Sequence, residues 1–170
     1  MCKQGHLAEI ALPTSLKETF LKHANTALTV QTGSWQQLGE YASAIRHEVF
    51  VQEQAVPVEL ELDEHDAIAL HALAMHDGTP VGTARLLPDA HIGRMAVRKA
   101  YRGQGIGGLL LQALMQEARR RGDTHVVLAA QCHAQAFYRA HGFETEGEIF
   151  MDAGIEHILM RRVFDAAKAL

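Results

Sequence analysis

The stretch that decides the fold is RGQGIGG, residues 102–108, which lies between a predicted strand and a predicted helix. The strand ends at Val97, and the helix covers residues 104–121 with apolar side chains along one face. N–H groups at a helix start have no partner within the helix, and glycines let an anion approach them without a Cβ in the way. The stretch therefore predicts a loop that binds a phosphate or pyrophosphate. The alternative is a glycine cluster that only makes a tight turn.

Two familiar phosphate-binding loops do not fit this stretch. A Walker loop needs Gly-Lys-Ser or Gly-Lys-Thr after its glycines, but Gly107 is followed here by Gly108 and Leu109. A dinucleotide-binding loop follows the first strand of a doubly wound sheet, whereas this loop comes mid-chain after predicted antiparallel strands. The spacing therefore disfavours both nucleoside triphosphate hydrolysis and dinucleotide binding.

The rest of the chain indicates one domain of strands and helices, as expected for 170 residues. An antiparallel meander turns at Asp77-Gly78, and the long helix then makes a crossover to a parallel strand. The predicted strands are residues 26–32, 67–75, 80–87, 90–97, 125–130, 143–151 and 155–162. The other predicted helices are one from the N-cap Ser34 to a point before Pro57, one over residues 134–141, and a short one near residues 15–20.

The predicted domain covers residues 26–164, between an amino-terminal extension of residues 1–25 and a tail of residues 165–170. Residues 59–66 are expected to be an acidic connection. The closing hairpin leaves a sheet edge that a second subunit could cover, which makes a homodimer an open expectation.

Composition excludes several classes of protein. Sixteen Lys and Arg against twenty Asp and Glu give a net charge of −4, which argues against nucleic acid as a partner. Two cysteines supply neither a disulfide framework nor a paired zinc motif, and the scattered histidines predict no metal site. No continuous apolar stretch is as long as the core of a signal peptide at the amino terminus, or as a membrane span anywhere in the chain. We therefore expect a cytoplasmic protein with no membrane partner.

Two motifs together resemble a known family. RGQGIG is similar to the Arg/Gln-x-x-Gly-x-Gly/Ala signature of the GNAT N-acetyltransferase superfamily, and AQAFYRAHGF, residues 134–143, is similar to its second motif. The runs RHEVFVQEQAVP, ELDEHD and DAGIEHILM resemble the ElaA-like and YjcF-like branch. The resemblance implies an α/β (α+β) fold, in which a mixed, mostly antiparallel sheet with a central splayed parallel strand pair is flanked by helices.

The resemblance also implies acetyl-CoA as co-substrate and assigns residues to it. Backbone groups of one strand would contact the pantetheine arm, the glycine loop would surround the pyrophosphate, and Gln131 stands where the family often has a pantetheine-binding Asn. The cofactor-binding residues implied are Met95, Ala96, Val97, Arg102, Gly103, Gln104, Gly105, Ile106, Gly107, Gln131 and Phe137. Tyr138 stands where the family usually places a tyrosine that protonates the departing thiolate.

Acetyl transfer to an amine also needs a proton acceptor. Lowering the pKa of an alkylamine from ~10.4 to about 7.5 requires roughly 4 kcal/mol, which a base, desolvation or both must supply. Candidate bases are Glu53, Glu61, Asp63, His71, Asp152 and His157. We favour His71 and His157 because an imidazole titrates near neutrality, although either can be a hydrogen-bonded structural histidine.

The sequence therefore predicts an enzyme that transfers acetyl from acetyl-CoA to a primary amine of a small molecule by direct attack in a ternary complex. Two alternatives stay open: a noncatalytic acyl-CoA-binding or sensing module, and a protein or peptide N-acetyltransferase.

Overall fold

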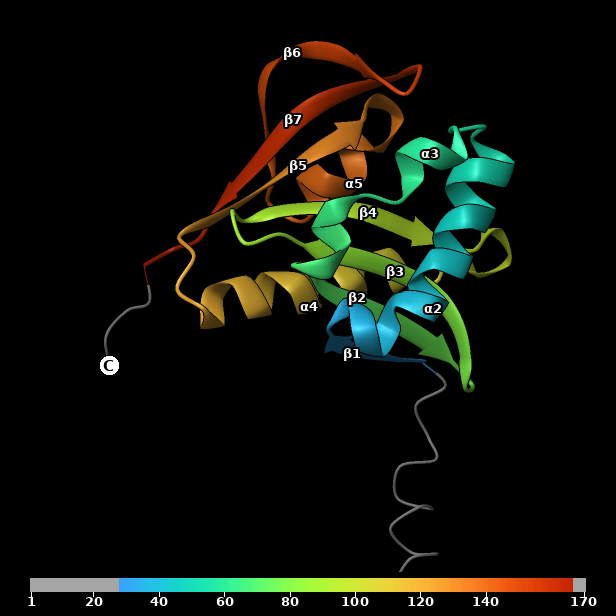
Figure 1. Ribbon diagram of the computed structural model, residues 1–170. Helices are drawn as coiled ribbons and strands as arrows, with labels where there is room; N and C mark the ends of the chain where they lie inside the picture. Colours follow the sequence, from blue (N-terminus) through green and yellow to red (C-terminus); the bar gives the residue numbers. More distant parts are fainter. Residues whose placement is uncertain (1–27, 167–170) are drawn as a thin grey trace, which may run out of the picture.

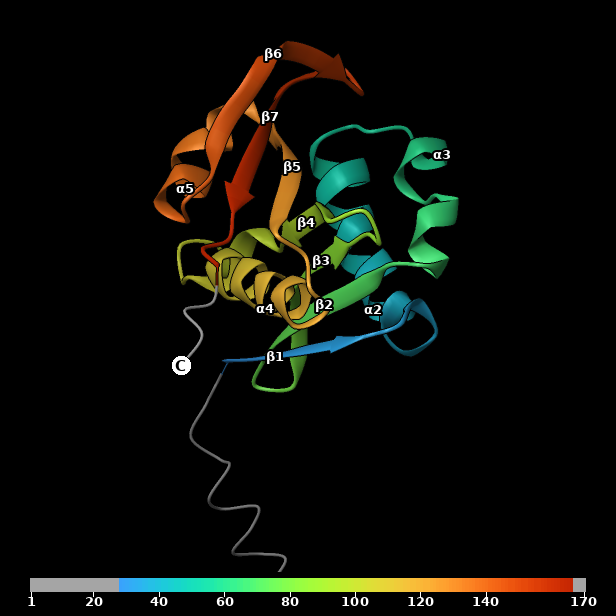
Figure 2. The ribbon, with the colours of Figure 1, turned by 90° about the vertical axis from the view of Figure 1, so that its left-hand side faces the viewer.

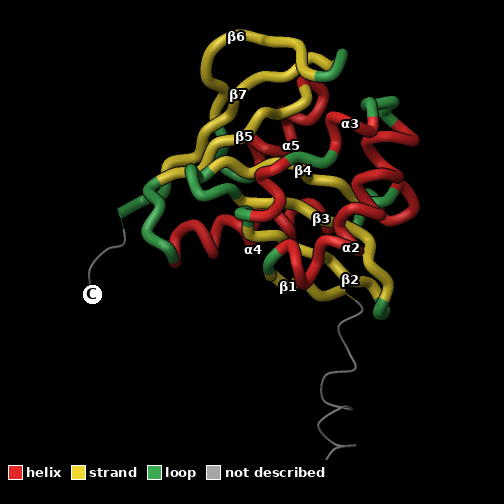
Figure 3. Tube along the Cα trace, viewed as in Figure 1, coloured by secondary structure: helices red, strands yellow, loops and turns green. Residues whose placement is uncertain are grey.

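The computed structural model describes residues 28–166, which form one mixed sheet with helices on both faces (Figures 1 and 3). The strands are β1 (Leu28–Gly33), β2 (Leu70–His76), β3 (Thr79–Leu86), β4 (His91–Val97), β5 (His125–Gln131), β6 (Glu144–Asp152) and β7 (Ile155–Val163). The α-helices are α2 (Trp35–Arg46), α3 (Val58–Glu61), α4 (Ile106–Arg120) and α5 (Gln135–Ala140). A π-helical segment (His47–Glu53) continues α2, and 3₁₀ turns cover Glu64–Ala67, Lys99–Tyr101 and Cys132–Ala134.

The strand order is β1-β2-β3-β4-β5-β7-β6, and only the β4–β5 pair is parallel within this sheet. That pair is short, because it aligns just His91 with Val127 and Ile92 with Leu128. The predicted fold class is confirmed, including the meander, the parallel crossover through α4 and the splay of the central strands. All nine residues of β6 are exposed at the outer edge of the sheet.

The core lies on both faces of the meander. Alternating residues of β2 point to opposite faces, so Ala72 and Ala74 join the cluster of α4 while Leu73 joins that of α2. Figure 2 shows α4 and α2 on either side of β2 and β3. β4 contributes to both clusters, with Ile92 in that of α4 and Ala96 in that of α2. None of the helices in residues 28–166 is long and apolar enough to cross a membrane.

Two predicted elements differ from the structure. The helix expected to run from Ser34 towards Pro57 is α-helical only to Arg46 and then widens into the π-helical segment. Residues 59–66, expected to be a connection, contain α3 and a 3₁₀ turn. The helix predicted near residues 15–20 lies outside the described residues.

Candidate active site

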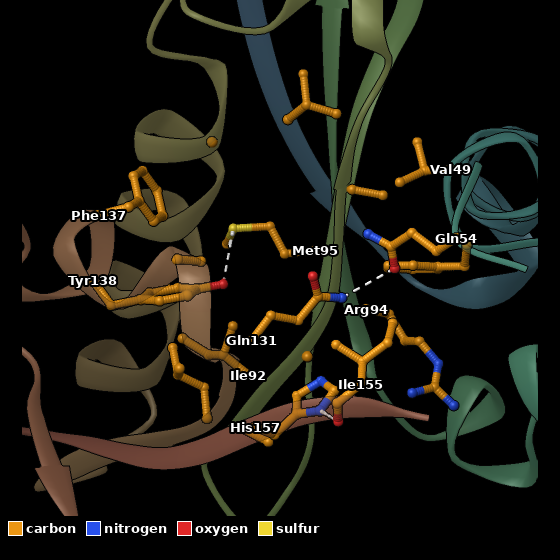
Figure 4. A pocket seen from close by; sticks show the side chains of 18 of the residues that line it. Val49, Gln54, Ile92, Arg94, Met95, Gln131, Phe137, Tyr138, Ile155 and His157 are labelled. Carbon is orange, nitrogen blue, oxygen red and sulfur yellow. Dashed lines mark hydrogen bonds between the residues drawn. The ribbon is translucent and has the colours of Figure 1, made fainter. Parts of the chain in front are cut away.

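The central feature of the site is a cavity that opens where β4 and β5 separate. Their pairing stops at Ile92 and Leu128, so beyond this point each strand has a free edge towards the other. The cavity has a volume of about 930 Å³, which lies in the range of small-molecule sites. Figure 4 shows side chains entering it from β4, β5, α5, β7 and the end of the π-helical segment.

Most of the predicted cofactor-binding residues line this cavity. They are Met95, Ala96, Val97, Arg102, Gly103, Gly105, Ile106, Gly107, Gln131 and Phe137. Gln104 does not belong to the lining, although its neighbours on both sides do. The structure therefore brings three separate segments together around one space, as a single elongated ligand would require.

The glycine loop presents its backbone to the cavity. Gly103 and Gly105 have φ angles of 77° and 81°, a region that side chains other than hydrogen rarely allow. A Cβ at either position would meet no atom within 4 Å. Within residues 28–166, the N–H groups of residues 103–108 donate to no other protein group, and α4 begins directly at Ile106. The loop can thus offer several N–H donors to an anion at the positive end of α4.

Arg102 fixes the entrance to the loop. Its Nε donates to the carbonyl oxygen of Val97 at 2.9 Å, and its Nη2 donates to both carboxylate oxygens of Glu53 at 3.0 and 2.9 Å. These bonds tie the loop to the end of β4 and to the π-helical segment. Glu53, one of the candidate bases, is therefore engaged in an ion pair.

Tyr138 places a proton donor inside the cavity. Its hydroxyl lies 3.8 Å from Sδ of Met95, across the opening between α5 and β4 (Figure 4). Phe137 and Phe143 pack edge-on against its ring, with centroid distances of 5.0 and 5.9 Å. Burial raises the pKa of Tyr138 from 10.0 to about 12. The hydroxyl therefore stays protonated at neutral pH.

His157 enters the same cavity from β7. Its Nδ1 lies 2.8 Å from the carbonyl oxygen of Ile155, and because a carbonyl only accepts, Nδ1 carries the proton in this contact. Nε2 of the neutral ring is then left with a lone pair. The ring stacks on Phe150 at a centroid distance of 5.9 Å, which fixes its plane. The arrangement is that of a proton acceptor held in one tautomer.

The structure does not bring His71, the other favoured base, to the cavity. The side chain is buried beside Trp35, and its Nε2 lies 2.9 Å from the carbonyl oxygen of Asp66. Burial lowers the pKa of His71, so the ring is neutral at neutral pH. This is the structural role that the sequence left open. Among the carboxylates, Glu61 and Asp152 line the cavity.

A buried charge cluster lies beside the cavity, and it consists of Arg46, Arg85, Arg94, Glu61, Asp63 and Asp66. Arg46 donates to Asp66 at 2.7 Å, and Arg85 donates to both oxygens of Asp63 at 2.6 and 2.7 Å. The hydrogen bond from Arg85 lowers the pKa of Asp63 to about 2. Burial opposes ionisation of Asp66, but hydrogen bonds from the two arginines outweigh it and lower its pKa. Three cations and three anions thus compensate one another.

Residues 22–164 match the family model described as an acetyltransferase (GNAT) domain. The chain belongs to the GNAT acetyltransferase family. The N-acetyltransferase YjcF of Bacillus subtilis is 38% identical over 122 residues, which cover 69% of this chain and 87% of that protein. The crystal structure of Escherichia coli ElaA has a TM-score of 0.72 at 30% identity and covers 79% of this chain and 99% of that chain. An acyl-CoA N-acyltransferase structure from Pseudomonas aeruginosa has a TM-score of 0.72 at 35% identity, covering 80% and 99%.

These similarities confirm the resemblance to the superfamily and to its ElaA-like and YjcF-like branch. They also make this GNAT protein an acyltransferase by family. The opposite wall of the cavity holds none of the predicted cofactor-binding residues. It comes from the π-helical segment, α3 and the β6–β7 turn, and includes Val49, Phe50, Gln54, Val56, Leu60, Asp152 and Ile155.

Sequence reasoning missed Gln54 as a site residue. Its Oε1 accepts a hydrogen bond of 3.0 Å from Nε2 of Gln131, which links the end of the π-helical segment to the end of β5 (Figure 4). Gln131 is one of the residues that the resemblance assigned to pantetheine binding. Its side chain reaches across the cavity to this partner. The only signal in the sequence was the run RHEVFVQEQAVP, which carries Gln54 without indicating its partner.

Proposed function

We propose that this GNAT protein transfers an acetyl group from acetyl-CoA to a primary amine of a small molecule, by direct attack in a ternary complex. The observation that carries the proposal is that the groups needed for binding and for proton transfer line one cavity. Gly103 and residues 105–108, whose N–H groups have no protein partner within residues 28–166, lie at one part of its wall, and Tyr138 and His157 lie at others. Family membership supports the acyl transfer, and the geometry supports the roles given below.

Acetyl-CoA would lie between β4 and β5. Charge-assisted hydrogen bonds of about 1.5–3 kcal/mol each make three or four loop N–H groups sufficient to hold its pyrophosphate. Met95, Ala96 and Val97 follow the last β4 residue paired with β5, so their backbone groups on that side have no strand partner and would face the pantetheine amides. The Val97 carbonyl already accepts a hydrogen bond from Arg102. The acetyl group would then point towards Met95 and Tyr138.

The chemical step needs two proton movements. The amine nitrogen forms a bond to the acetyl carbon, the carbon–sulfur bond breaks, and the electron pair of that bond leaves with sulfur. Tyr138 is proposed to donate its hydrogen to this sulfur, because its raised pKa keeps the proton in place until negative charge develops nearby. The amine loses its own proton to Nε2 of His157, directly or through a water molecule.

The opposite wall of the cavity, where the amine acceptor would bind, favours an amine with an apolar substituent. Val49, Phe50, Val56, Leu60 and Ile155 contribute apolar side chains to this wall. An apolar surrounding disfavours an ammonium ion and lowers its pKa, which reduces the demand on His157. A small arylalkyl or branched alkyl primary amine fits this wall better than a zwitterionic amino acid.

The test is a thiol-release assay with acetyl-CoA against a panel of primary amines, with CoA binding measured by calorimetry. Tyr138→Phe should lower kcat by about 10²-fold, a typical contribution of a general acid, with the acetyl-CoA dissociation constant changed less than twofold. Tyr41→Phe, on the exposed surface of α2, is the matched control and should keep wild-type kcat.

Three results would contradict the proposal. Unchanged kcat in Tyr138→Phe would remove Tyr138 from the reaction. Tight CoA binding without turnover of any amine would indicate a noncatalytic acyl-CoA-binding module. Turnover of peptides in preference to all small amines would indicate a protein or peptide N-acetyltransferase.

A further inference from the structure

Arg94 adopts a backbone conformation that its residue type disfavours. Its φ angle is +48°, in the left-handed region where a Cβ approaches the following carbonyl oxygen. Glycine takes this conformation without strain, and Asn or Asp tolerates it, whereas Arg has no local hydrogen bond to offset it. Strain of this kind persists only where the surrounding structure imposes it. Contacts of Arg94 with the surrounding structure must therefore hold it in this left-handed conformation.

The position of Arg94 in the sheet explains the backbone. Thr83 pairs with Ala96 and Arg85 pairs with Gly93, so two residues of β4, Arg94 and Met95, stand opposite Ala84 alone. This is a β-bulge, which bends the strand and increases its twist. The bulge begins two residues after Ile92, the last β4 residue that pairs with β5. Arg94 therefore lies at the point where the cavity opens.

The side chain of Arg94 leads from the bulge to the opposite wall of the cavity. Its Nη2 donates to the carbonyl oxygen of Leu60 at 3.0 Å and to a carboxylate oxygen of Asp63 at 3.2 Å. Its Nε donates to the carbonyl oxygen of Glu61 at 3.0 Å. One guanidinium thus holds three residues of the segment Val58–Asp63, which we call the α3 segment. Leu60 and Glu61 of this segment line the cavity.

The other arginines of the charge cluster share two of these three acceptors with Arg94, namely the Glu61 carbonyl and the Asp63 carboxylate. Arg46 donates to the Glu61 carbonyl at 2.7 Å and to Asp66, and Arg85 donates to Asp63 and Asp66. Within residues 28–166, the Leu60 carbonyl accepts a side-chain hydrogen bond from Arg94 alone. Arg94 is also the one arginine of the cluster that lines the cavity. The side chain of Arg94 therefore links β4 to Leu60 of the α3 segment.

We propose that Arg94 is a positioning residue that sets the distance between the cofactor strand β4 and the acceptor wall formed by the α3 segment. The inference rests on the proposed function, since it assigns the α3 segment to acceptor binding. The bulge aims the guanidinium, and the guanidinium fixes Leu60 and Glu61. An arginine is retained in a glycine conformation because glycine would keep the bulge and lose this link.

Arg94→Gly is the discriminating variant, because it suits the backbone and removes only the side chain. Asp77→Gly is the matched control, since Asp77 has a φ of +47° in the β2–β3 turn and does not line the cavity. Hydrogen exchange of backbone amides, monitored by mass spectrometry, should quicken at least tenfold over residues 57–63 in Arg94→Gly. Exchange over residues 102–108 and 125–131 should stay as in the wild type.

The kinetic readout separates positioning from general loosening of the fold. In Arg94→Gly, KM for the best amine should rise at least tenfold, while kcat and the CoA dissociation constant stay within threefold and twofold. Arg94→Lys keeps the charge and one donor group, so it should recover part of the lost KM. Asp77→Gly should match the wild type in every measurement.

Unchanged exchange over residues 57–63, or an unchanged amine KM, would overturn the proposal. A CoA dissociation constant that rises together with the amine KM would also overturn it, since the defect would then be general. If the wild type acetylates no amine, the proposed function fails by itself. The exchange measurement still decides in that case whether Arg94 holds the α3 segment.

Discussion

Ionisation of Tyr138 is expected to lower the stability of this fold at alkaline pH. Burial raises the pKa of Tyr138 to about 12, because the phenolate would lose its hydration in the cavity. In the unfolded chain the pKa returns to about 10. Between these two values the unfolded chain releases a proton that the folded protein keeps. The free energy of unfolding therefore falls as the pH rises through this window.

The size of the effect follows from the two pKa values. A difference of about two in pKa corresponds to about 2.7 kcal/mol, and about 1.4 kcal/mol of this is already lost at pH 11. The contribution of Tyr138 to stability is complete below about pH 9, and about 0.4 kcal/mol of it is lost by pH 10. Tyr138→Phe removes the titrating group, so the variant lacks this part of the pH dependence while keeping that of every other group.

The assay is urea unfolding of the wild type and Tyr138→Phe at intervals from pH 8 to pH 11.5. We expect the stability difference between them to be constant up to about pH 9, and to shift in favour of the variant by about 0.4 kcal/mol at pH 10 and about 1.4 kcal/mol at pH 11. Tyr41→Phe controls for the loss of a hydroxyl from an exposed position. A difference that stays constant to pH 11.5 would show that the fold does not desolvate Tyr138.

Gly105→Asp should weaken CoA binding at least about 100-fold in calorimetry, because it places a negative charge beside the loop N–H groups that would hold the pyrophosphate. Gly78→Asp is its control, since Gly78 has a similar φ of +78° in the β2–β3 turn, and normal CoA affinity in folded Gly105→Asp would refute the loop assignment. In His157→Asn, the side-chain amide can still donate to the Ile155 carbonyl but offers no basic nitrogen. We therefore expect kcat to fall about 10²-fold while the affinity for acetyl-CoA stays unchanged. Full activity of His157→Asn would move the base to Asp152 or Glu61.

Local patterns were sufficient for most of the fold. The apolar face of residues 104–121 predicted α4, and Asp77-Gly78 predicted the β2–β3 turn, where both residues have positive φ. The loop at residues 102–108 predicted a set of backbone donors next to a helix start, and the structure leaves the N–H groups of residues 103–108 free of protein partners within residues 28–166. Each of these features depends on residues close together in the chain.

The features that sequence reasoning missed depend on residues far apart in the chain. Arg94 contacts Leu60 from 34 positions away, and Gln131 contacts Gln54 from 77 positions away. Strand periodicity cannot say which face of β2 lies towards the cavity, so it could not separate His71 from His157. The structure separates them by their partners, because His71 packs on Trp35 of α2 whereas His157 lies between β7 and the cavity.

The site is built where backbone pairing stops. β4 leaves β5 after Ile92, which frees the N–H and C=O groups along one edge of the strand, and the loop after β4 adds the free N–H groups of residues 103–108. Backbone polar groups in a folded protein need partners, and an amide-containing ligand can supply them as a neighbouring strand would. The proposed recognition by backbone needs no side chain at Gln104, which is absent from the cavity lining while Gly103 and Gly105 belong to it. At this loop, backbone conformation is therefore under a tighter constraint than side-chain identity, and the positive φ of Gly103 and Gly105 is the part that substitution should tolerate least.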